Sequence, residues 1–215
     1  MTYNFDEIID RRNTNSENVE GWRPYIFHCG PERVFPYKDE EFIRMWVADM
    51  EFAVAPEILQ AITDRVHRRI LGYTLVYDKG YYEVLRAWCE SRYGWSFPKE
   101  QLTFSPGVIP ALYQLTEDLV KPLNGRVLTM TPAYGFFLHA CEYNGVELVT
   151  SPLREEGGRF SIDWEDLEAK AADPDVKLLM LCNPHNPLGI VWTPEELQRM
   201  AELCMQYHVT MLSDE

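Results

Sequence analysis

Long apolar runs and an excess of basic residues are both missing from this chain of 215 residues. No stretch of 18 apolar residues occurs, so the sequence offers no candidate for a membrane-spanning helix. The N-terminal residues MTYNFDEIIDRRNTNS lack the apolar core of a signal peptide, and we expect none. The 20 Lys and Arg residues are outnumbered by 34 Asp and Glu residues, which gives a formal net charge of -14. This balance argues against nucleic acid or an anionic membrane as the main partner, while leaving room for a local phosphate site.

Paired cysteines and the common nucleotide-binding motifs are also missing. The five cysteines are widely spaced and form no C-x-x-C pair: Cys29, Cys89, Cys141, Cys182 and Cys204. This usage is typical of reduced, buried thiols, and we expect a cytoplasmic protein without a metal site. Neither GxxxxGK[ST] nor GxGxxG occurs, which disfavours a nucleoside triphosphate or a Rossmann dinucleotide as ligand.

The composition, with 46% apolar and 25% charged residues, is that of a globular protein. We expect residues 1–54 to form an irregular N-terminal arm and entry segment, with one short strand at Ile43–Ala48. Residues 55–215 are expected to form the main domain. Its first helix is predicted to begin at Pro56 and to end at a Gly72 cap, because apolar residues recur every four positions: Ile58, Ile62, Val66 and Ile70. A second helix is predicted from Gly80 to Tyr93, with four inward side chains: Val84, Leu85, Trp88 and Cys89.

From residue 105 onward, short apolar runs alternate with helical segments. The strands are predicted at 126–130, 146–153, 177–182 and 209–215, and helices are predicted between them, with Asp163 and the Thr193–Glu196 capping box as helix starts. Repeated strand–helix units favour an α/β fold with a mainly parallel sheet, covered on both faces as a three-layer α/β/α structure. The last strand lacks a following helix, so we expect the chain to be truncated within a domain.

Three polar segments follow predicted strands or open a helix at the edge where parallel sheets bind ligands: SPGVIP, NPHNPLG and the final SDE at residues 213–215. SPGVIP, at residues 105–110, offers backbone N–H groups at a helix N-terminus, which can hold a phosphate or can be an ordinary turn. NPHNPLG, at residues 183–189, is predicted to be a rigid loop in which Asn183 or Asn186 either points an amide at a ligand or makes a structural Asx-turn. His185 in the same loop has no paired nucleophile and is weak evidence for base catalysis.

Two further side chains point to the same edge. Asp214 ends an apolar strand, where a carboxylate is costly unless it is paired, and Tyr134 opens a helix after residues 126–130. Each can also be explained structurally, Asp214 as a surface residue and Tyr134 as part of the core. A phosphate cradle, a flat aromatic ring, an amide and a carboxylate are together the groups that a pyridoxal 5′-phosphate site requires.

Several segments resemble fold-type-I pyridoxal-phosphate enzymes, in the order in which that family carries them: ADMEFAVAPEI, GYT, SPGVIPALY, TPAYGFF, LLMLCNPHNPLGIVWTPEEL and SDE. The resemblance is strongest to cystathionine β-lyase-like carbon–sulfur lyases, the group that includes the maltose-regulon modulator protein. It covers nearly the whole chain. ADMEF and TPAY favour these lyases over the class I/II aminotransferases, which share the NPHNP and SDE patterns.

The resemblance implies a role for six residues. The backbone amides of Val108 and Ile109 would cradle the cofactor phosphate, Tyr134 would stack on the ring, Asn186 would bond its phenolic oxygen, and Asp214 would pair with the pyridine nitrogen. Tyr73, in GYT, would reach the phosphate of a neighbouring subunit, which implies a homodimer with shared active sites. Leu188 replaces the Thr or Val that is common in this loop.

The resemblance also implies what this chain lacks. The family's Schiff-base lysine and the arginine that binds the substrate carboxylate would lie beyond Glu215, and none of the six lysines matches the lysine motif: Lys38, Lys79, Lys99, Lys121, Lys170 and Lys177. We therefore expect the N-terminal part of a lyase that cleaves cysteine S-conjugates to thiol, pyruvate and ammonia, inactive as this chain alone. The alternatives are an aminotransferase on an amino-acid substrate and a non-catalytic fragment or regulatory binding protein.

Overall fold

The computed structural model describes residues 3–76 and 79–215 and, for Lys79, the backbone alone. The chain divides into two compact units, Met1–Tyr81 and Tyr82–Glu215, and each is described by itself. The expected boundary between residues 54 and 55 stays a prediction. In the described part of the chain, no helix is both long and apolar enough to cross a membrane.

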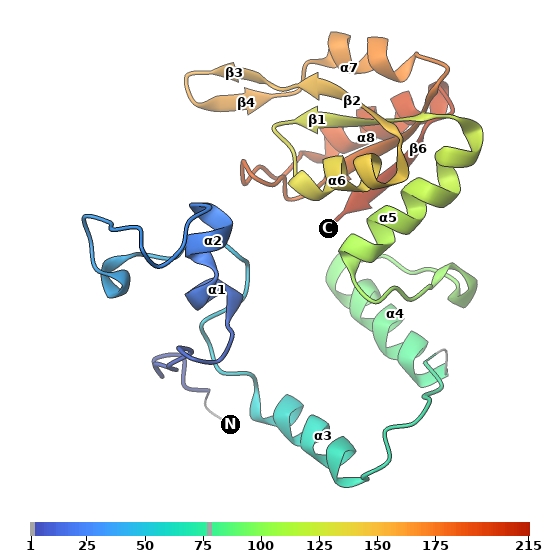
Figure 1. Ribbon diagram of the computed structural model, residues 1–215. Coiled ribbons are helices and arrows are strands. Elements are labelled where there is room, and N and C mark those ends of the chain that lie inside the picture. The colour runs from blue at the N-terminus through green and yellow to red at the C-terminus, as the bar shows by residue number, and fades with distance from the viewer. Residues whose placement is uncertain (1–2, 77–78) are drawn as a thin grey trace. The chain divides into compact units, whose positions relative to one another are not determined.

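The second unit is built on a four-stranded parallel sheet (Figure 1). Its strands are β1 (Arg126–Thr131), β2 (Glu147–Pro152), β5 (Val176–Cys182) and β6 (Thr210–Asp214), in the spatial order β2-β1-β5-β6. Each neighbouring pair is parallel. The carboxyl ends of the four strands therefore meet at one edge of the sheet, as the alternation of strands and helices predicts.

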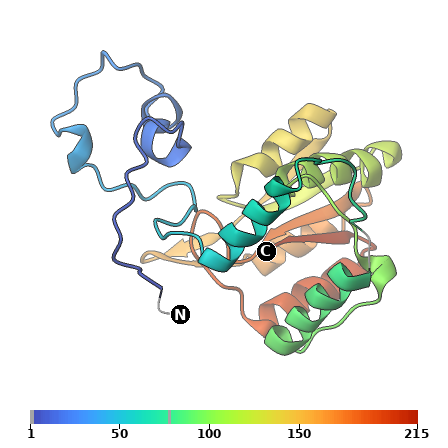
Figure 2. The same ribbon diagram turned by 90° about the horizontal axis from the view of Figure 1, so that it is seen from below.

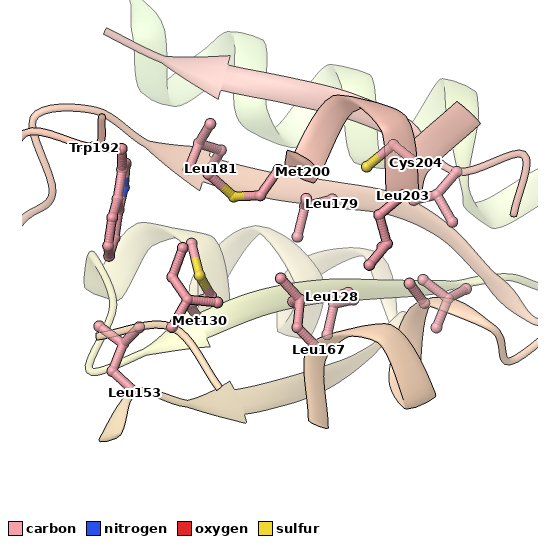
Figure 3. Close-up of a cluster of buried hydrophobic side chains, with 14 residues drawn as sticks. Leu128, Met130, Leu153, Leu167, Leu179, Leu181, Trp192, Met200, Leu203 and Cys204 are labelled. Atoms are coloured by element: carbon pink, nitrogen blue, oxygen red, sulfur yellow. The ribbon is translucent and has the colours of Figure 1, made fainter. Parts of the chain in front are cut away.

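Helices cover both faces of this sheet, and the arrangement can be followed in Figure 2. Successive side chains of a strand point to opposite faces, so Leu178 packs with α5 (Val108–Leu119) and α6 (Gly135–Asn144), while Leu179 packs with α7 (Trp164–Ala171) and α8 (Pro194–Gln206). Figure 3 shows the second of these clusters, in which Leu128, Leu179 and Met200 are completely buried. The three-layer α/β/α architecture is confirmed.

Local sequence signals set the helix ends as expected. The side chain of Asp163 accepts a hydrogen bond from the Asp166 backbone N–H, and Thr193 with Glu196 forms the complete capping box at the start of α8. These bonds satisfy N–H groups that a helix start otherwise leaves without a partner. Helix α6 ends at Gly145, which has a φ of 64°, a left-handed conformation that glycine adopts without strain.

The second unit also contains elements that the sequence patterns did not predict. A short antiparallel hairpin pairs β3 (Arg154–Glu156) with β4 (Arg159–Ser161). The turn between them is Gly157-Gly158, with φ values of 58° and 80°, which is the chemistry of a tight hairpin turn. The 3-10 turns η2 (Lys99–Gln101) and η3 (Lys121–Leu123) were not predicted either. The predicted second helix is α4 (Lys79–Tyr93), most of which lies in this unit.

The first unit contains α1 (Glu17–Glu20), α2 (Trp22–Ile26), η1 (Asp39–Glu41) and α3 (Pro56–His67). The strand predicted at Ile43–Ala48 is wrong, because these residues, all of them described, form none. The side chain of Asn18 donates to the backbone oxygens of Trp46 and Val47, at 2.9 and 3.4 Å, and Val47 has a φ of 52°. A left-handed residue interrupts the extended backbone that a strand needs.

The predicted end of α3 is also wrong. The helix begins at Pro56 as expected but ends at His67, because Arg69 has a φ of 60° and its N–H bonds back to the Val66 oxygen. The apolar residues of this helix are more than half exposed in the single chain: Ile58, Leu59, Ile62 and Val66.

The limits of α4 agree with the prediction, but the inward face assigned to it is only partly correct. Cys89 is buried, whereas Val84 and Trp88 are exposed at 74% and 53%. The guanidinium of Arg92 lies over the Trp88 ring, 4.6 Å from its centroid, so this indole is covered by a cation on its own helix.

Candidate functional site

The N-terminus of α5 presents backbone N–H groups at the edge of the sheet. Gly107 precedes the helix, and among the described residues no side chain caps it. The first two helical residues, Val108 and Ile109, each carry an N–H group that the helix itself does not use, while Pro110 has none. Two N–H donors and the positive end of the helix dipole therefore face outward from this turn.

Asp214 ends β6 on the same side of the sheet as this helix start. Ser105, Gly107, Val108 and Asp214 line one cavity of about 400 Å³. Its other lining residues are Ala111, Leu112, Leu115, Leu212, Ser213 and Glu215. The structure thus brings the predicted phosphate-binding turn and the predicted carboxylate to a common space. Apart from Asp214 and Glu215, the lining is uncharged.

The Asp214 carboxylate is partly buried without a cationic partner. Burial raises its pKa, and a hydrogen bond from the Cys182 thiol partly opposes this shift. In the part of the chain that the structure describes, no Lys, Arg or His forms an ion pair with it. Burial disfavours the charged form of such a carboxylate, and a cation placed beside it would stabilise that form.

Tyr134 and Asn186 lie at the same edge, beyond β1 and β5. Tyr134 is the residue before α6, and its ring contacts Phe136 and Phe137, with centroids 5.3 and 6.0 Å apart. Asn186 lies in the exposed loop after β5. Neither residue lines the cavity of Asp214. The sheet brings both predicted residues to the correct edge, and their contact with a ligand stays a prediction.

The first asparagine of the loop has a structural role. The side-chain oxygen of Asn183 accepts a hydrogen bond from the Trp192 backbone N–H at 3.2 Å, and its own N–H bonds to the Asp214 backbone oxygen at 2.9 Å. Of the two alternatives for Asn183, the structure therefore supports the structural one. The loop is non-helical, as predicted, with one isolated bridge between His185 and Ile190.

Tyr73 belongs to the first unit and is fully exposed in the single chain. Its predicted contact with the phosphate of a neighbouring subunit is not tested by this structure.

Three of the six lysines make side-chain contacts within the second unit. The Lys170 ammonium pairs with Asp166, 2.7 Å away, and Lys121 lies near Glu117. Lys177 donates to the Pro174 oxygen. The side chain of Lys79 lies outside the described residues.

Sequence reasoning missed Cys182 and Ser213 as neighbours of the site. Ser213 lines the cavity, and Cys182 contacts Asp214 directly. The alternation of β5 was the available signal, since Cys182 lies on the same face as Leu178 and Met180, toward α5. Among the residues described, no group of three or more His, Cys, Asp or Glu side chains is placed to hold a metal ion.

Comparisons with known proteins show the family to which the chain belongs. Residues 40–215 match the family model described as aminotransferase class I and II. The cystathionine beta-lyase PatB of Bacillus subtilis is 42% identical over 171 residues, which cover 80% of this chain and 44% of that protein. Protein MalY of Escherichia coli is 28% identical over 99% of this chain and 52% of its own length.

Among solved structures, the PLP-bound C-S lyase from Staphylococcus hominis superposes with a TM-score of 0.87 and 41% identity. The match covers all of this chain and 51% of that one. Cystalysin from Treponema denticola, a structure that contains pyridoxal 5′-phosphate, superposes with a TM-score of 0.85 and 29% identity, over 100% and 52% of the two chains. The chain therefore spans about half the length of the relatives it matches.

Proposed function

The chain belongs to the class I and II aminotransferase family, and from that premise we propose that it forms the N-terminal part of a pyridoxal-phosphate-dependent C–S β-lyase. The proposed substrates are cysteine S-conjugates such as cystathionine, cleaved to a thiol, pyruvate and ammonia. The cofactor of the family is pyridoxal 5′-phosphate, which its PLP-bound structural neighbours contain. The similarity to proteins named cystathionine beta-lyase and C-S lyase supports lyase activity.

The residues present fit this cofactor, and Asp214 carries the argument. A partly buried carboxylate with a raised pKa and no cationic partner among the described residues suits a protonated pyridine nitrogen. The same cavity is open to the start of α5, where two N–H groups and the helix dipole suit a phosphate. A single cavity therefore offers complementary groups for both charged ends of the cofactor.

We assign the chain's residues the following roles. Val108 and Ile109 donate their backbone N–H groups to the phosphate, and Asp214 keeps the pyridine nitrogen protonated. Tyr134 holds the ring plane, and the Asn186 amide donates to the phenolic oxygen. When bound, the protonated ring withdraws electrons from the substrate α-carbon, which allows the β-sulfur to leave. The chain's own contribution is to bind the cofactor, to orient it and to keep one proton at the nitrogen beside Asp214.

Tyr73 extends the proposal to a homodimer with shared sites. Its ring is fully exposed in the single chain, so its hydroxyl is available to a phosphate held by a second subunit. The many exposed apolar residues of the first unit, including Ile58 and Ile62 of α3, support burial of this region in an assembly.

The experiment uses the full-length enzyme, meaning this chain continued to the length of its relatives. Incubated with cystathionine and pyridoxal 5′-phosphate but no keto acid, it is expected to release thiol and pyruvate in equal amounts. A requirement for a keto-acid acceptor would instead identify an aminotransferase, the second candidate, which family membership favours. Tight binding of the cofactor without either reaction would identify a regulatory binding protein.

A further inference from the structure

We propose that His185 is a positioning residue that joins the segment before Tyr134 to the segment before Asn186 and so holds both side chains at the cofactor edge. The proposal rests on the proposed function, because it concerns the residues that would face the cofactor ring. His185 itself is 2% exposed and would touch neither substrate nor cofactor directly.

A single hydrogen bond makes the connection. The Nε2 atom of His185 lies 2.9 Å from the backbone oxygen of Pro132, across 53 residues of sequence. A carbonyl oxygen only accepts, so Nε2 carries the proton and donates it. Pro132 lies two residues before Tyr134, and His185 immediately precedes Asn186. The bond therefore links the two loops next to the residues assigned to the ring.

Strand pairing does not make this connection. The pairing of β1 with β5 extends from Arg126 to Thr129, opposite Val176 to Met180. Tyr134 and Asn186 lie beyond these ends, where the paired backbone no longer fixes the separation of the two segments. The imidazole lies in this part of the structure and connects them.

The imidazole is held by contacts from its own loop. Its ring meets the Trp192 indole edge to face, with centroids 5.2 Å apart and planes at 64°. The His185 N–H bonds to the Ile190 oxygen at 2.6 Å, and the Gly189 N–H bonds to the His185 oxygen at 2.7 Å. Trp192 is fixed in turn, because its indole N–H donates to the Cys182 oxygen at 3.0 Å.

The second ring nitrogen argues against a role in packing alone. Nδ1 is buried and has no hydrogen-bond partner among the described residues. A buried polar atom without a partner destabilises the fold, so an apolar side chain would suit this position better if it only filled space. The bond from Nε2 to Pro132 is the interaction that an apolar side chain could not make.

The test compares three substitutions in the full-length holoenzyme. Gln at position 185 places an amide donor near the position of Nε2, whereas Met has similar length and no donor. His139→Met, on the exposed face of α6, is the matched control. The measurements are the dissociation constant of pyridoxal 5′-phosphate, the visible circular dichroism of the bound cofactor, and kcat and KM for cystathionine.

We expect His185→Met to weaken cofactor affinity about tenfold, to reduce the circular dichroism of the bound cofactor and to lower kcat more than it raises KM. His185→Gln should recover most of each loss, and His139→Met should match the unmodified enzyme. If His185→Met does not fold, His185→Asn replaces it, since its amide is too short to reach Pro132. Equal behaviour of the Gln variant and the donor-less or shorter variant would overturn the proposal. Failure of the unmodified enzyme to bind the cofactor would overturn the proposed function itself, and this inference with it.

Discussion

The Sγ atom of Cys182 lies 3.9 Å from Oδ2 of Asp214, and the two residues face each other across paired positions of β5 and β6. The same sulfur lies 3.3 Å from the Pro184 oxygen. Burial raises the pKa of Cys182, and the neighbouring carboxylate adds to the shift while the Asn186 backbone opposes it. The thiol is therefore neutral at physiological pH and lies beside the carboxylate as a weak donor, without competing charge.

The burial of four cysteines predicts their reactivity. Burial raises the pKa of Cys141 to about 12 and that of Cys204 to about 11, and Cys89 and Cys182 are also buried. Only the thiolate reacts, so a disulfide reagent at pH 8 should label Cys29 rapidly and the other four only after denaturation. Rapid labelling of more than one thiol per native chain would contradict the buried positions of the other four cysteines.

The same shifts predict a loss of stability at alkaline pH. In the native state Cys141 and Cys204 retain their protons up to pH values where the unfolded thiols, with a pKa near 9.0, have lost them. Their contribution to stability is therefore complete below pH 9 and is lost as the pH rises toward 11 and 12. Urea unfolding at pH 8 and pH 10 measures this change. Replacing both residues by Ala should reduce the difference between the two pH values, and an unchanged difference would exclude these thiols as its source.

Replacing Tyr73 by Phe should weaken cofactor binding in the full-length enzyme while leaving its fold intact. Loss of a hydrogen bond to a charged group costs about 1.5–3 kcal/mol, which corresponds to roughly ten- to a hundredfold in affinity. Titration with pyridoxal 5′-phosphate measures this effect. Tyr143→Phe on α6, which is 77% exposed in the single chain, is the control. An unchanged dissociation constant for Tyr73→Phe would remove the residue from the proposed site.

The 215-residue chain by itself should not anchor the cofactor covalently. Lys170 and Lys121 lie close to carboxylates, and no lysine matches the family's lysine motif. Reduction with borohydride in the presence of pyridoxal 5′-phosphate, followed by mass spectrometry, should give no stoichiometric label on any of the six lysines, and no thiol should be released from cystathionine. One fully labelled lysine together with thiol release would show an active site built differently from that of the family.

Much of the second unit could be predicted because its signals are local. The capping box at Thr193 and the Asp163 cap each depend on residues three positions apart. The continuous apolar runs of β1 and β5 predict strands that are buried on both faces of a parallel sheet. The β3–β4 hairpin was missed, although Gly157-Gly158 is a local hairpin signal that the sequence carries.

The errors occurred where distant residues decide the conformation. Residues 43–48, which the structure describes in full, have a strand-like composition, but they form no strand. The Asn18 side chain, far away in sequence, donates hydrogen bonds to the backbone oxygens of Trp46 and Val47. The early end of α3 is a local exception, since a left-handed Arg69 ends the helix three residues before the expected Gly72 cap. The link from His185 to Pro132 joins residues 53 positions apart, and no periodicity or motif encodes it.

The central claim is that Asp214 keeps a cofactor nitrogen protonated, and Asp214→Asn in the full-length enzyme tests it most directly. The amide cannot stabilise a pyridinium, whereas the start of α5 still holds the phosphate, so catalysis and binding should separate. We predict that kcat for cystathionine falls by about a hundredfold or more, while the dissociation constant of pyridoxal 5′-phosphate changes by less than about tenfold. Asp118→Asn, at the opposite end of α5, should leave both unchanged. Near-normal turnover of Asp214→Asn would contradict the account.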